Sequence, residues 1–314
     1  MAQAQRQSAL EAHGEGAARL LELTWVLFIG GGLIFVAVML IGLLALSGPP
    51  AVRSALSRHS WIVGGGIAFP VVVLSALLVY TFVAASNIVR AEQAPAVARI
   101  EILGELWWWR VKYLDERGNT VVETANEITV PAGQPVDLML ISHNVIHSLW
   151  VPNLAGKLDM IPGRVNRLRI QAHAPGTFRG QCAEYCGAQH AKMALYVVAL
   201  NPGDFAGWLA AQAEPAPQPQ EPLVQQGMQL FATSRCAICH TVRGTSFAGG
   251  LGPDLTHFGS RLSIAAGTLP NTRGAAAAWV TGSQHLKPGN RMPAYNSFSG
   301  EELRALSAYL ESLR

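Results

Sequence analysis

The chain has 314 residues, of which 50% are hydrophobic and only 14% are charged, and its formal net charge is +3 at pH 7. At roughly 100–200 residues per domain, this length leaves room for two or three structural units. The small charge and the absence of a Lys/Arg run exclude nucleic acid as a partner, and the apolar composition is typical of a membrane protein.

Two uncharged runs near the N-terminus, residues 23–46 and 61–86, are long enough to cross a membrane. Each exceeds the roughly 20 apolar residues with which a helix spans a hydrocarbon core. The loop between them carries Arg53 and Arg58 but no acidic residue, which favours a cytoplasmic loop. We therefore expect a two-helix transmembrane hairpin over residues 23–86 in a bacterial inner membrane, with both chain ends on the outer, periplasmic face.

The segment before the hairpin, residues 1–22, is expected to be exported with the chain that follows the hairpin. A cleaved signal peptide is the alternative for the first span. However, the apolar run is longer than the apolar core of such peptides, and Glu11 and Glu15 precede it. Neither span has an ionisable residue at its centre, so we expect an anchor and an assembly surface, without an ion path.

Residues 91–202 combine short β-rich runs with Gly and Pro turns. Strands are expected at residues 121–124, 127–130, 136–141 and 194–200. Short strands that are regularly interrupted by turn residues are typical of a small β-sandwich or barrel, so we expect an all-β domain here.

Within this domain, residues 182–193 read CAEYCGAQHAKM, with the spacing Cys-x3-Cys-x3-His-x2-Met. Soft thiolate and thioether donors together with imidazole suit copper. A disulfide between Cys182 and Cys186 is one alternative, and a zinc site is another. Zinc sites are built from thiolates, imidazoles and carboxylates, so the closing methionine favours copper.

A copper site of this kind needs a second imidazole. His147 stands in an apolar stretch, residues 145–151, that is expected to bury its ring, and a buried unpaired imidazole is costly. His143 and His173 have polar neighbours and are the weaker candidates. We therefore expect His147 to join the motif.

These residues resemble subunit II of the haem–copper cytochrome c oxidases. The resemblance covers residues 20–202 and rests on residues 147–152 (HSLWVP), on the Lys-x-Asp-x-x-Pro-Gly-Arg pattern of residues 157–164, and on residues 182–193. It implies a two-helix membrane hairpin followed by a cupredoxin-like Greek-key sandwich that holds a dinuclear copper centre, CuA.

The resemblance also implies a role for each donor. Cys182 and Cys186 would be the bridging thiolates. His147 and Met193 would complete one copper, and His190 and the main-chain carbonyl of Glu184 would complete the other. The Glu184 carboxylate is expected to bind Mg²⁺ shared with the core subunit, because hard oxygen donors suit that ion. A solvated loop glutamate is the alternative.

Residues 107–109 are three consecutive tryptophans. Because side chains alternate along a strand, at least one is expected to reach the surface. In the family an aromatic cluster lies here and its first tryptophan, matched by Trp107, admits electrons; a place at the membrane interface is compatible with this. Arg110 and Lys112 follow where the family often has an acid that helps to dock a basic cytochrome. The basic residues fit a tethered donor.

Residues 203–222 are expected to form a linker, whose Pro/Gln-rich part reads as an extended spacer. Beyond it, Cys236-x-x-Cys239-His240 is a haem c attachment pattern, in which the thiols bond the haem and the histidine binds iron. Residues 223–314 resemble an all-α class I cytochrome c domain.

The sixth iron ligand is expected to be Met292, which matches the distal methionine loop of that family. His257 and His285 are alternatives, whereas Met228 is expected in the core. The carbonyl of Pro253 is expected to orient the proximal histidine. A Ser-x-x-Glu capping box at residues 299–302 should open a last helix with leucines along one face.

The order of anchor, CuA domain, spacer and haem domain resembles subunit II of a caa-type cytochrome c oxidase. It implies an electron-entry subunit that passes electrons from haem c to CuA and on to the haem–copper core subunit, where O₂ is reduced and protons are translocated. The partners would be core subunit I, other oxidase subunits, the membrane, and a cytochrome c or another reductant.

Two alternatives remain for the function. Residues 57–61 lack an acid that serves a proton pathway in many members, so a nitric oxide reductase of the same superfamily is an open acceptor complex. From a different class, a copper-delivery or redox-sensing anchor protein would bind copper labilely.

Overall fold

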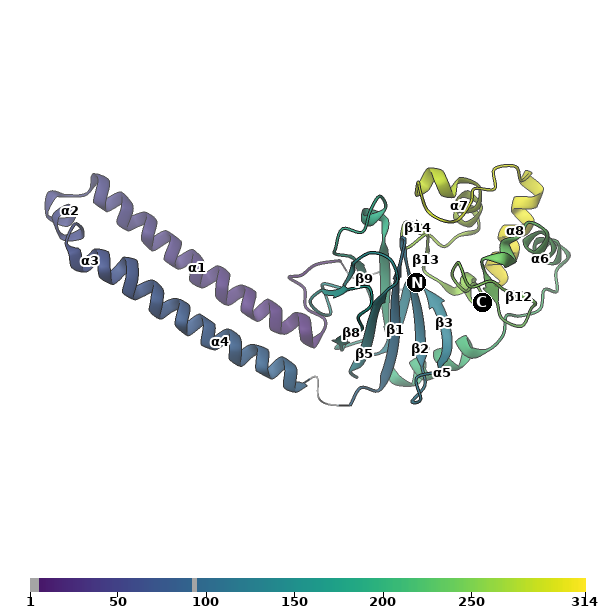
Figure 1. Cartoon of the computed structure of the whole chain (residues 1–314), viewed down its shortest axis with the longest axis horizontal. Coiled ribbons are helices and arrows are strands. Elements are labelled where there is room, and N and C mark those ends of the chain that lie inside the picture. Colours follow the sequence, from purple (N-terminus) through teal and green to yellow (C-terminus); the bar gives the residue numbers. More distant parts are fainter. Residues whose placement is uncertain (1–5, 92–94) are drawn as a thin grey trace. The chain divides into compact units, whose positions relative to one another are not determined.

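Two long apolar helices form the membrane hairpin of the chain (Figure 1). The computed structural model describes residues 6–91 and 95–314. Residues 1–5 of the expected exported segment and residues 92–94 at the start of the expected β domain lie outside the described residues. The elements of the hairpin are α1 (Glu15–Ser47), α2 (Pro50–Leu56), α3 (His59–Val63), a π-helical turn (Gly64–Ala68) and α4 (Phe69–Ala91). Both spans are long and apolar enough to cross a bilayer.

The second membrane helix is irregular near Pro70. The π-helical turn directly precedes this proline. A proline cannot donate a main-chain hydrogen bond, so a widened turn nearby is a common way to accommodate it.

A two-sheet sandwich follows the hairpin and confirms the expected all-β domain. One sheet has the order β3-β2-β1-β5-β8 and the other β4-β10-β9-β6-β7. The strands are β1 (Ala98–Glu105), β2 (Trp108–Leu114), β3 (Thr120–Ala125), β4 (Glu127–Pro131), β5 (Val136–Ser142), β6 (His147–Trp150), β7 (Leu158–Met160), β8 (Asn166–Ile170), β9 (Gly176–Cys182) and β10 (Ala194–Leu200). The four strands that the sequence predicts correspond to β3, β4, β5 and β10.

The core of the sandwich is built from alternating apolar side chains of both sheets. Ile100 and Ile102 of β1, Leu138 of β5 and Val197 of β10 are all fully buried. This alternation buries one face of each sheet. The packed sheets hold the loop ends of β6 and β9 together at one end of the sandwich.

The expected linker differs from the structure in its first half, where helix α5 (Pro202–Ala213) lies. Phe205, Trp208 and Leu209 of this helix pack against the core of the sandwich. Their i, i+3, i+4 spacing places them on one helical face. The Pro/Gln-rich residues that follow α5 keep an irregular path up to the next helix.

The haem domain is mainly helical, as expected. Its helices are α6 (Pro222–Thr233), α7 (Arg273–Leu286) and α8 (Gly300–Ser312), joined by short 3₁₀ turns η3 (Cys236–Ile238) and η4 (Phe258–Ser260) and by two small strand pairs, β11 (Thr241–Val242) with β12 (Phe247–Ala248) and β13 (Ser263–Ile264) with β14 (Leu269–Pro270). The capping box of α8 is present, and its leucines 306, 310 and 313 are buried.

The chain enters the membrane hairpin from one compact unit and returns to that unit after the hairpin. Residues up to 17 and residues 96–314 form one unit, and residues 18–95 form the other. Within the first unit, Gly14 forms a β-bridge with Ala172, and the His13 N–H donates to the Asn153 carbonyl at 2.8 Å. Both ends of the hairpin therefore lead into one folded body.

Candidate metal and haem sites

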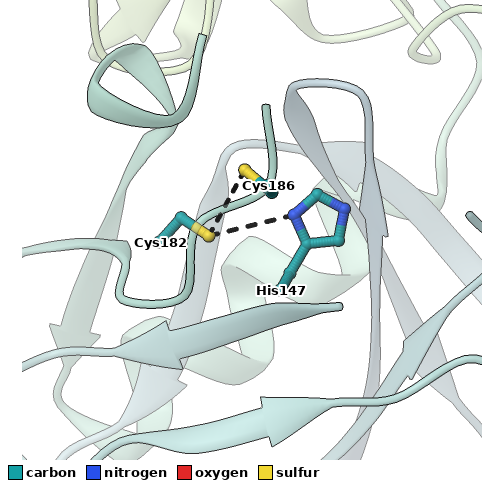
Figure 2. A group of neighbouring side chains, drawn as sticks. All are labelled: His147, Cys182 and Cys186. Atoms are coloured by element: carbon teal, nitrogen blue, oxygen red, sulfur yellow. Dashed lines mark hydrogen bonds between the residues drawn. The ribbon is translucent and has the colours of Figure 1, made fainter. Parts of the chain in front are cut away.

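A buried cluster of soft donors lies where β6 begins and β9 ends (Figure 2). Cys182 Sγ is 3.7 Å from Cys186 Sγ and 3.8 Å from His147 Nδ1. His147 is fully buried, and each cysteine is 3% exposed. Both cysteines are free thiols, at a separation well beyond the about 2 Å of a disulfide bond. The three side chains therefore face one another as separate donors.

The other residues of the motif adjoin this cluster through Cys186. His190 Nδ1 lies 3.7 Å and Met193 Sδ lies 3.9 Å from Cys186 Sγ. The main-chain carbonyl of Glu184 is 3.2 Å from Cys182 Sγ. A hydrogen bond of 2.9 Å from Cys182 N to Met193 O closes the base of the loop. The structure thus gathers every predicted copper donor in one place.

The spacing of these donors fits a soft metal ion. Two donors that each lie about 2.3 Å from one ion in a tetrahedral arrangement are about 3.8 Å apart. The hydrogen bond between the two thiols lowers the pKa of Cys182 and raises that of Cys186, so one of the two ionises readily. Thiolate is the form of cysteine that binds a metal. Thiolate, thioether and imidazole together favour copper.

His147 is held by Asn144, a residue that the sequence reading passed over. His147 Nε2 lies 3.1 Å from Asn144 Oδ1, so the Nε2–H donates and the lone pair of Nδ1 faces Cys182. Metal-binding histidines commonly donate their other N–H in this way. An asparagine three residues before a histidine is too common to be a signal in a sequence. The rival histidines, His143 and His173, are exposed.

Gly104 of β1 gives the His147 ring its space. A Cβ added at Gly104 would lie 2.7 Å from His147 Cδ2, and the ring is fully buried. We therefore expect Gly104→Ala to destabilise the protein by about 1–3 kcal/mol and to weaken copper binding, since the imidazole must move. Thermal unfolding and copper titration of the solubilised chain measure both effects.

A matched control for this substitution is Gly207→Ala in α5. A Cβ at Gly207 meets no atom within 4 Å, and alanine is the better helix former. The control should keep or raise stability and leave copper binding unchanged. Equal behaviour of the Gly104 and Gly207 variants would contradict the steric role of Gly104.

Trp107 lies in the turn between β1 and β2 and contacts the loop of the copper donors. Its Nε1–H donates to the carbonyl of Cys186 at 2.8 Å. A Cβ at Gly187 would lie 3.2 Å from Trp107 Cζ2, so the indole packs on that loop. Trp107 and Trp108 are partly exposed and Trp109 is fully buried, as the alternation predicts.

The carboxylate of Glu184 lies in a small charged group at the surface. Lys157 Nζ is 3.4 Å from Glu184 Oε2 and 3.7 Å from Asp159 Oδ1. Both carboxylates are more than two-fifths exposed. A partner chain can therefore reach the Glu184 carboxylate, while the main chain of the same residue faces the sulfur cluster.

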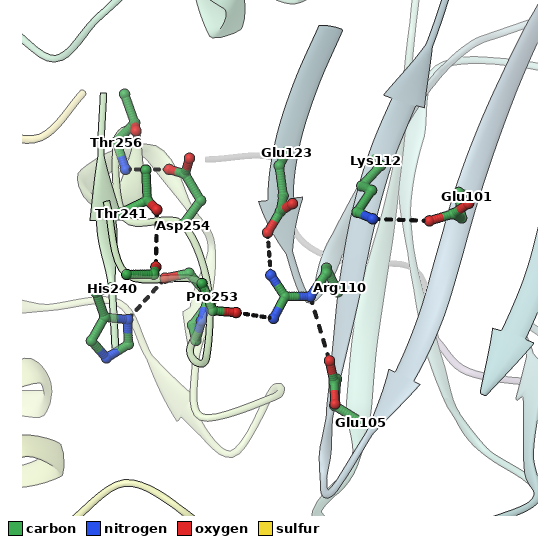
Figure 3. Close-up of polar contacts among 12 residues, drawn as sticks. Glu101, Glu105, Arg110, Lys112, Glu123, His240, Thr241, Pro253, Asp254 and Thr256 are labelled. Atoms are coloured by element: carbon green, nitrogen blue, oxygen red, sulfur yellow. Dashed lines mark hydrogen bonds and ion pairs between the residues drawn. The ribbon is translucent and has the colours of Figure 1, made fainter. Parts of the chain in front are cut away.

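The haem attachment residues surround the turn η3. Cys236 and Cys239 are free and partly exposed, and burial raises the pKa of Cys236 to about 11. The His240 Nδ1–H donates to the Pro253 carbonyl at 2.8 Å, which confirms the expected orientation (Figure 3). This bond leaves Nε2 free for iron. Burial lowers the pKa of His240, which favours the neutral form that binds a metal.

The loop between α7 and α8 holds Met292 through its main chain. The Met292 carbonyl accepts hydrogen bonds from Ser283 Oγ at 2.9 Å and from Gln284 Nε2 at 2.7 Å. Its N–H donates to Asn290 Oδ1 at 2.8 Å. The side chain is partly buried against the core of the haem domain.

The rival ligands have other surroundings. Met228 packs against the core of the haem domain, as expected. His257 Nε2 lies 3.1 Å from the carbonyl of Glu214, and His285 is exposed. Met292 therefore remains our predicted sixth ligand.

Similarity to known proteins agrees with this two-site arrangement. Residues 112–200 match the family described as cytochrome c oxidase subunit II, periplasmic domain, and residues 224–314 match the cytochrome c family. The chain is 40% identical over 215 residues to cytochrome c oxidase subunit 2 of Alkalihalophilus pseudofirmus, and 31% identical over 225 residues to that of Bacillus subtilis.

The chain carries, over residues 112–200, the periplasmic domain of the cytochrome c oxidase subunit II family. It also carries a C-terminal cytochrome c domain. Each alignment covers 68% of this chain and, in that order, 61% and 62% of the relatives' own lengths. The chain thus spans about three-fifths of the length of the relatives it matches.

Among solved structures, the periplasmic domain of subunit II of the cytochrome oxidase of Bradyrhizobium japonicum is similar to part of this chain. The two are 28% identical, with a TM-score of 0.36, and the match covers 38% of this chain and 95% of that one.

Proposed function

We propose that this chain is the electron-entry subunit of a terminal cytochrome c oxidase. The observation that carries the proposal is the buried group of His147, Cys182 and Cys186, with His190 and Met193 in contact with it. Such a closed set of soft donors leaves no open position for a substrate, which suits electron transfer.

The copper donors are assigned as the family resemblance implies. Cys182 and Cys186 would bridge two coppers, with His147 and Met193 on one and His190 and the Glu184 carbonyl on the other. When bound, a dinuclear copper centre supplies one-electron transfer with little change of geometry. The chain's own contribution is to fix the donors, through Asn144 on one imidazole and the Cys182–Met193 hydrogen bond below the loop.

The haem domain would hold a covalent haem c. Cys236 and Cys239 would bond the haem, and His240 and Met292 would be the axial ligands. The haem supplies a one-electron carrier; the protein orients His240 through Pro253 and ties the Met292 loop to α7.

Electrons would pass from an external donor to haem c, then to CuA, and then to a haem–copper core subunit that reduces O₂ and translocates protons. The contact between Trp107 and Cys186 supports Trp107 as the residue through which electrons enter the copper centre. The chain would be anchored in a bacterial inner membrane. The return of the chain to one folded body after the hairpin supports a topology with both ends on the outer face.

The surface position of Glu184 supports a further cofactor, Mg²⁺ shared with the core subunit. Carboxylate oxygens are ligands that Mg²⁺ prefers. The Lys157 ammonium, which now lies between Glu184 and Asp159, occupies a place where a divalent cation would balance the same charges.

Optical and EPR spectra of the purified full chain test this function. A mixed-valence dinuclear copper signal together with a low-spin c-type haem is the expected result. Mononuclear blue copper, or zinc in metal analysis, would refute the copper assignment. A nitric oxide reductase is the second candidate, because residues 57–61 lack the acid found in many members. The two functions are separated by isolating the membrane partner and comparing its consumption of O₂ with that of NO.

A further inference from the structure

The ammonium of Lys287 is buried at the contact between the haem domain and the copper domain. Lys287 lies just after α7, and its residue is only 2% exposed. Its Nζ donates to three main-chain carbonyls: Trp107 at 2.8 Å, Lys192 at 2.8 Å and Ala265 at 3.2 Å. An ammonium has three donors, so the three carbonyls satisfy it completely.

These acceptors come from both domains. Trp107 and Lys192 belong to the copper domain, and Ala265 belongs to the haem domain. Burial lowers the pKa of Lys287 to about 7, which reflects how far its charge is withdrawn from water. A buried ammonium with unmade hydrogen bonds is costly. A docked arrangement that buried Lys287 in another register would leave its donors unpaired, so these hydrogen bonds favour this register.

Neighbouring contacts fix the same register. Lys192 Nζ donates back to the Leu286 carbonyl, so the two lysines bind across the contact in both directions. Gln189 Nε2 donates to the Pro288 carbonyl at 2.8 Å. Gln189 and Lys192 adjoin the copper donors His190 and Met193 in the chain, and Pro288 belongs to the loop that carries Met292.

Three more hydrogen bonds join the domains without Lys287. Arg110, which lies between Glu105 and Glu123, donates to the Gly250 carbonyl at 2.9 Å, in the loop that leads to Pro253 (Figure 3). The others run from Leu262 N to Glu127 Oε2 at 2.8 Å and from Ala194 N to Ala266 O at 3.0 Å. Arg110 thus contacts the haem domain at the position where the sequence pattern fits a tethered donor.

The Lys287 loop also covers Trp107. A Cβ at Gly289 would lie 3.8 Å from Trp107 Cη2, and the opposite side of the indole system donates to Cys186. Trp107 is therefore sandwiched between the segment that leads to Met292 and the copper donors.

We propose that Lys287 is a positioning residue that docks the haem domain on the copper domain with Trp107 between the two redox sites. Docking itself needs no electron transfer. The effect of docking on the rate of electron transfer between haem and copper rests on the function proposed above.

The test separates docking from the covalent tether. A protease site is inserted among residues 217–220 of the full chain, the chain is cut, and association of the haem domain with the remainder is measured by gel filtration and titration at about pH 6, below the pKa of Lys287. The cut wild-type chain should stay associated. Lys287→Met, which keeps the length of the side chain but loses its donors, should weaken association by at least about tenfold.

The matched control is Arg304→Met, which breaks an exposed ion pair with Glu301 within α8 and should leave association unchanged. Gln189→Ala alters the other domain and should weaken association in the same direction, should the Lys287 variant fold poorly. Unchanged haem and copper spectra establish that each variant is intact. Dissociation of the cut wild-type chain, or equally tight association of the Lys287 variant, would overturn the proposal.

A second readout is the rate of haem-to-copper electron transfer after photoreduction of the uncut chain. The Lys287 variant should be slower by at least about tenfold, with both spectra unchanged. If the wild type shows no such transfer but association depends on Lys287, docking stands and the electron relay fails. If transfer is fast in both chains, Lys287 does not position the sites.

Discussion

The Cys186→Ser chain is expected to lose its dinuclear copper centre while it keeps its haem. Cys186 contacts Cys182, His190 and Met193, so its sulfur is the donor nearest to all parts of the cluster. Serine fills nearly the same space but offers a hard oxygen that suits copper poorly. Electron delivery to the core subunit should fall by on the order of a hundredfold or more, because the copper centre through which the proposed electron path runs is lost.

EPR and metal analysis of the purified variant measure this loss, and the optical spectrum of the haem provides the internal reference. The reciprocal control is Cys236→Ser, which removes one haem thioether and should leave the copper signal intact. A Cys186 variant that retained a mixed-valence signal would show that another residue bridges the metals.

The second large effect is expected from Met292→Ala. Loss of the thioether should leave the haem covalently attached through Cys236 and Cys239, but change the spin state of the iron. Because methionine ligation raises the haem potential, the potential should fall by on the order of 0.1 V. A haem with a lower potential gives its electron to copper more readily, but it accepts an electron from the external donor less readily.

Redox titration and the optical spectrum of the full chain measure these changes. Met228→Ala is the matched control, because it removes the same side chain from the core of the haem domain. It should reduce stability and leave spin state and potential as they are. An unchanged spectrum in the Met292 variant would exclude this residue as a ligand and leave His257 and His285 as the candidates.

The sequence predicts the parts of the sites that are local in the chain. Cys182, Cys186, His190 and Met193 stand within one short loop, so their spacing alone predicts that they meet. The haem pattern of residues 236–240 is local in the same way. His147 comes from a distant strand. It could be assigned to the copper site only because its apolar neighbours in the sequence predicted that its ring is buried.

The contacts that support the sites were beyond prediction because they join segments far apart in the chain. Gly104 matters through a ring 43 positions later, and Lys287 through carbonyls of residues 107 and 192. Neither residue type is unusual at its position in the sequence. The expected linker over residues 203–222 likewise missed helix α5, because Phe205 and Trp208 pack on a surface that only the folded sandwich supplies.

The N-terminal residues have a practical consequence for making a soluble form of the outer domains. Asn153 is fully buried, and its side-chain amide donates to the carbonyls of Arg6 and Glu11 at 3.1 and 2.9 Å. A fragment that begins at residue 96 would lack both acceptors and would lose about 0.5–1.5 kcal/mol of stability for each hydrogen bond. A soluble version therefore needs residues 6–17, supplied through a short peptide in place of the hairpin or as a separate strand that complements the truncated fragment.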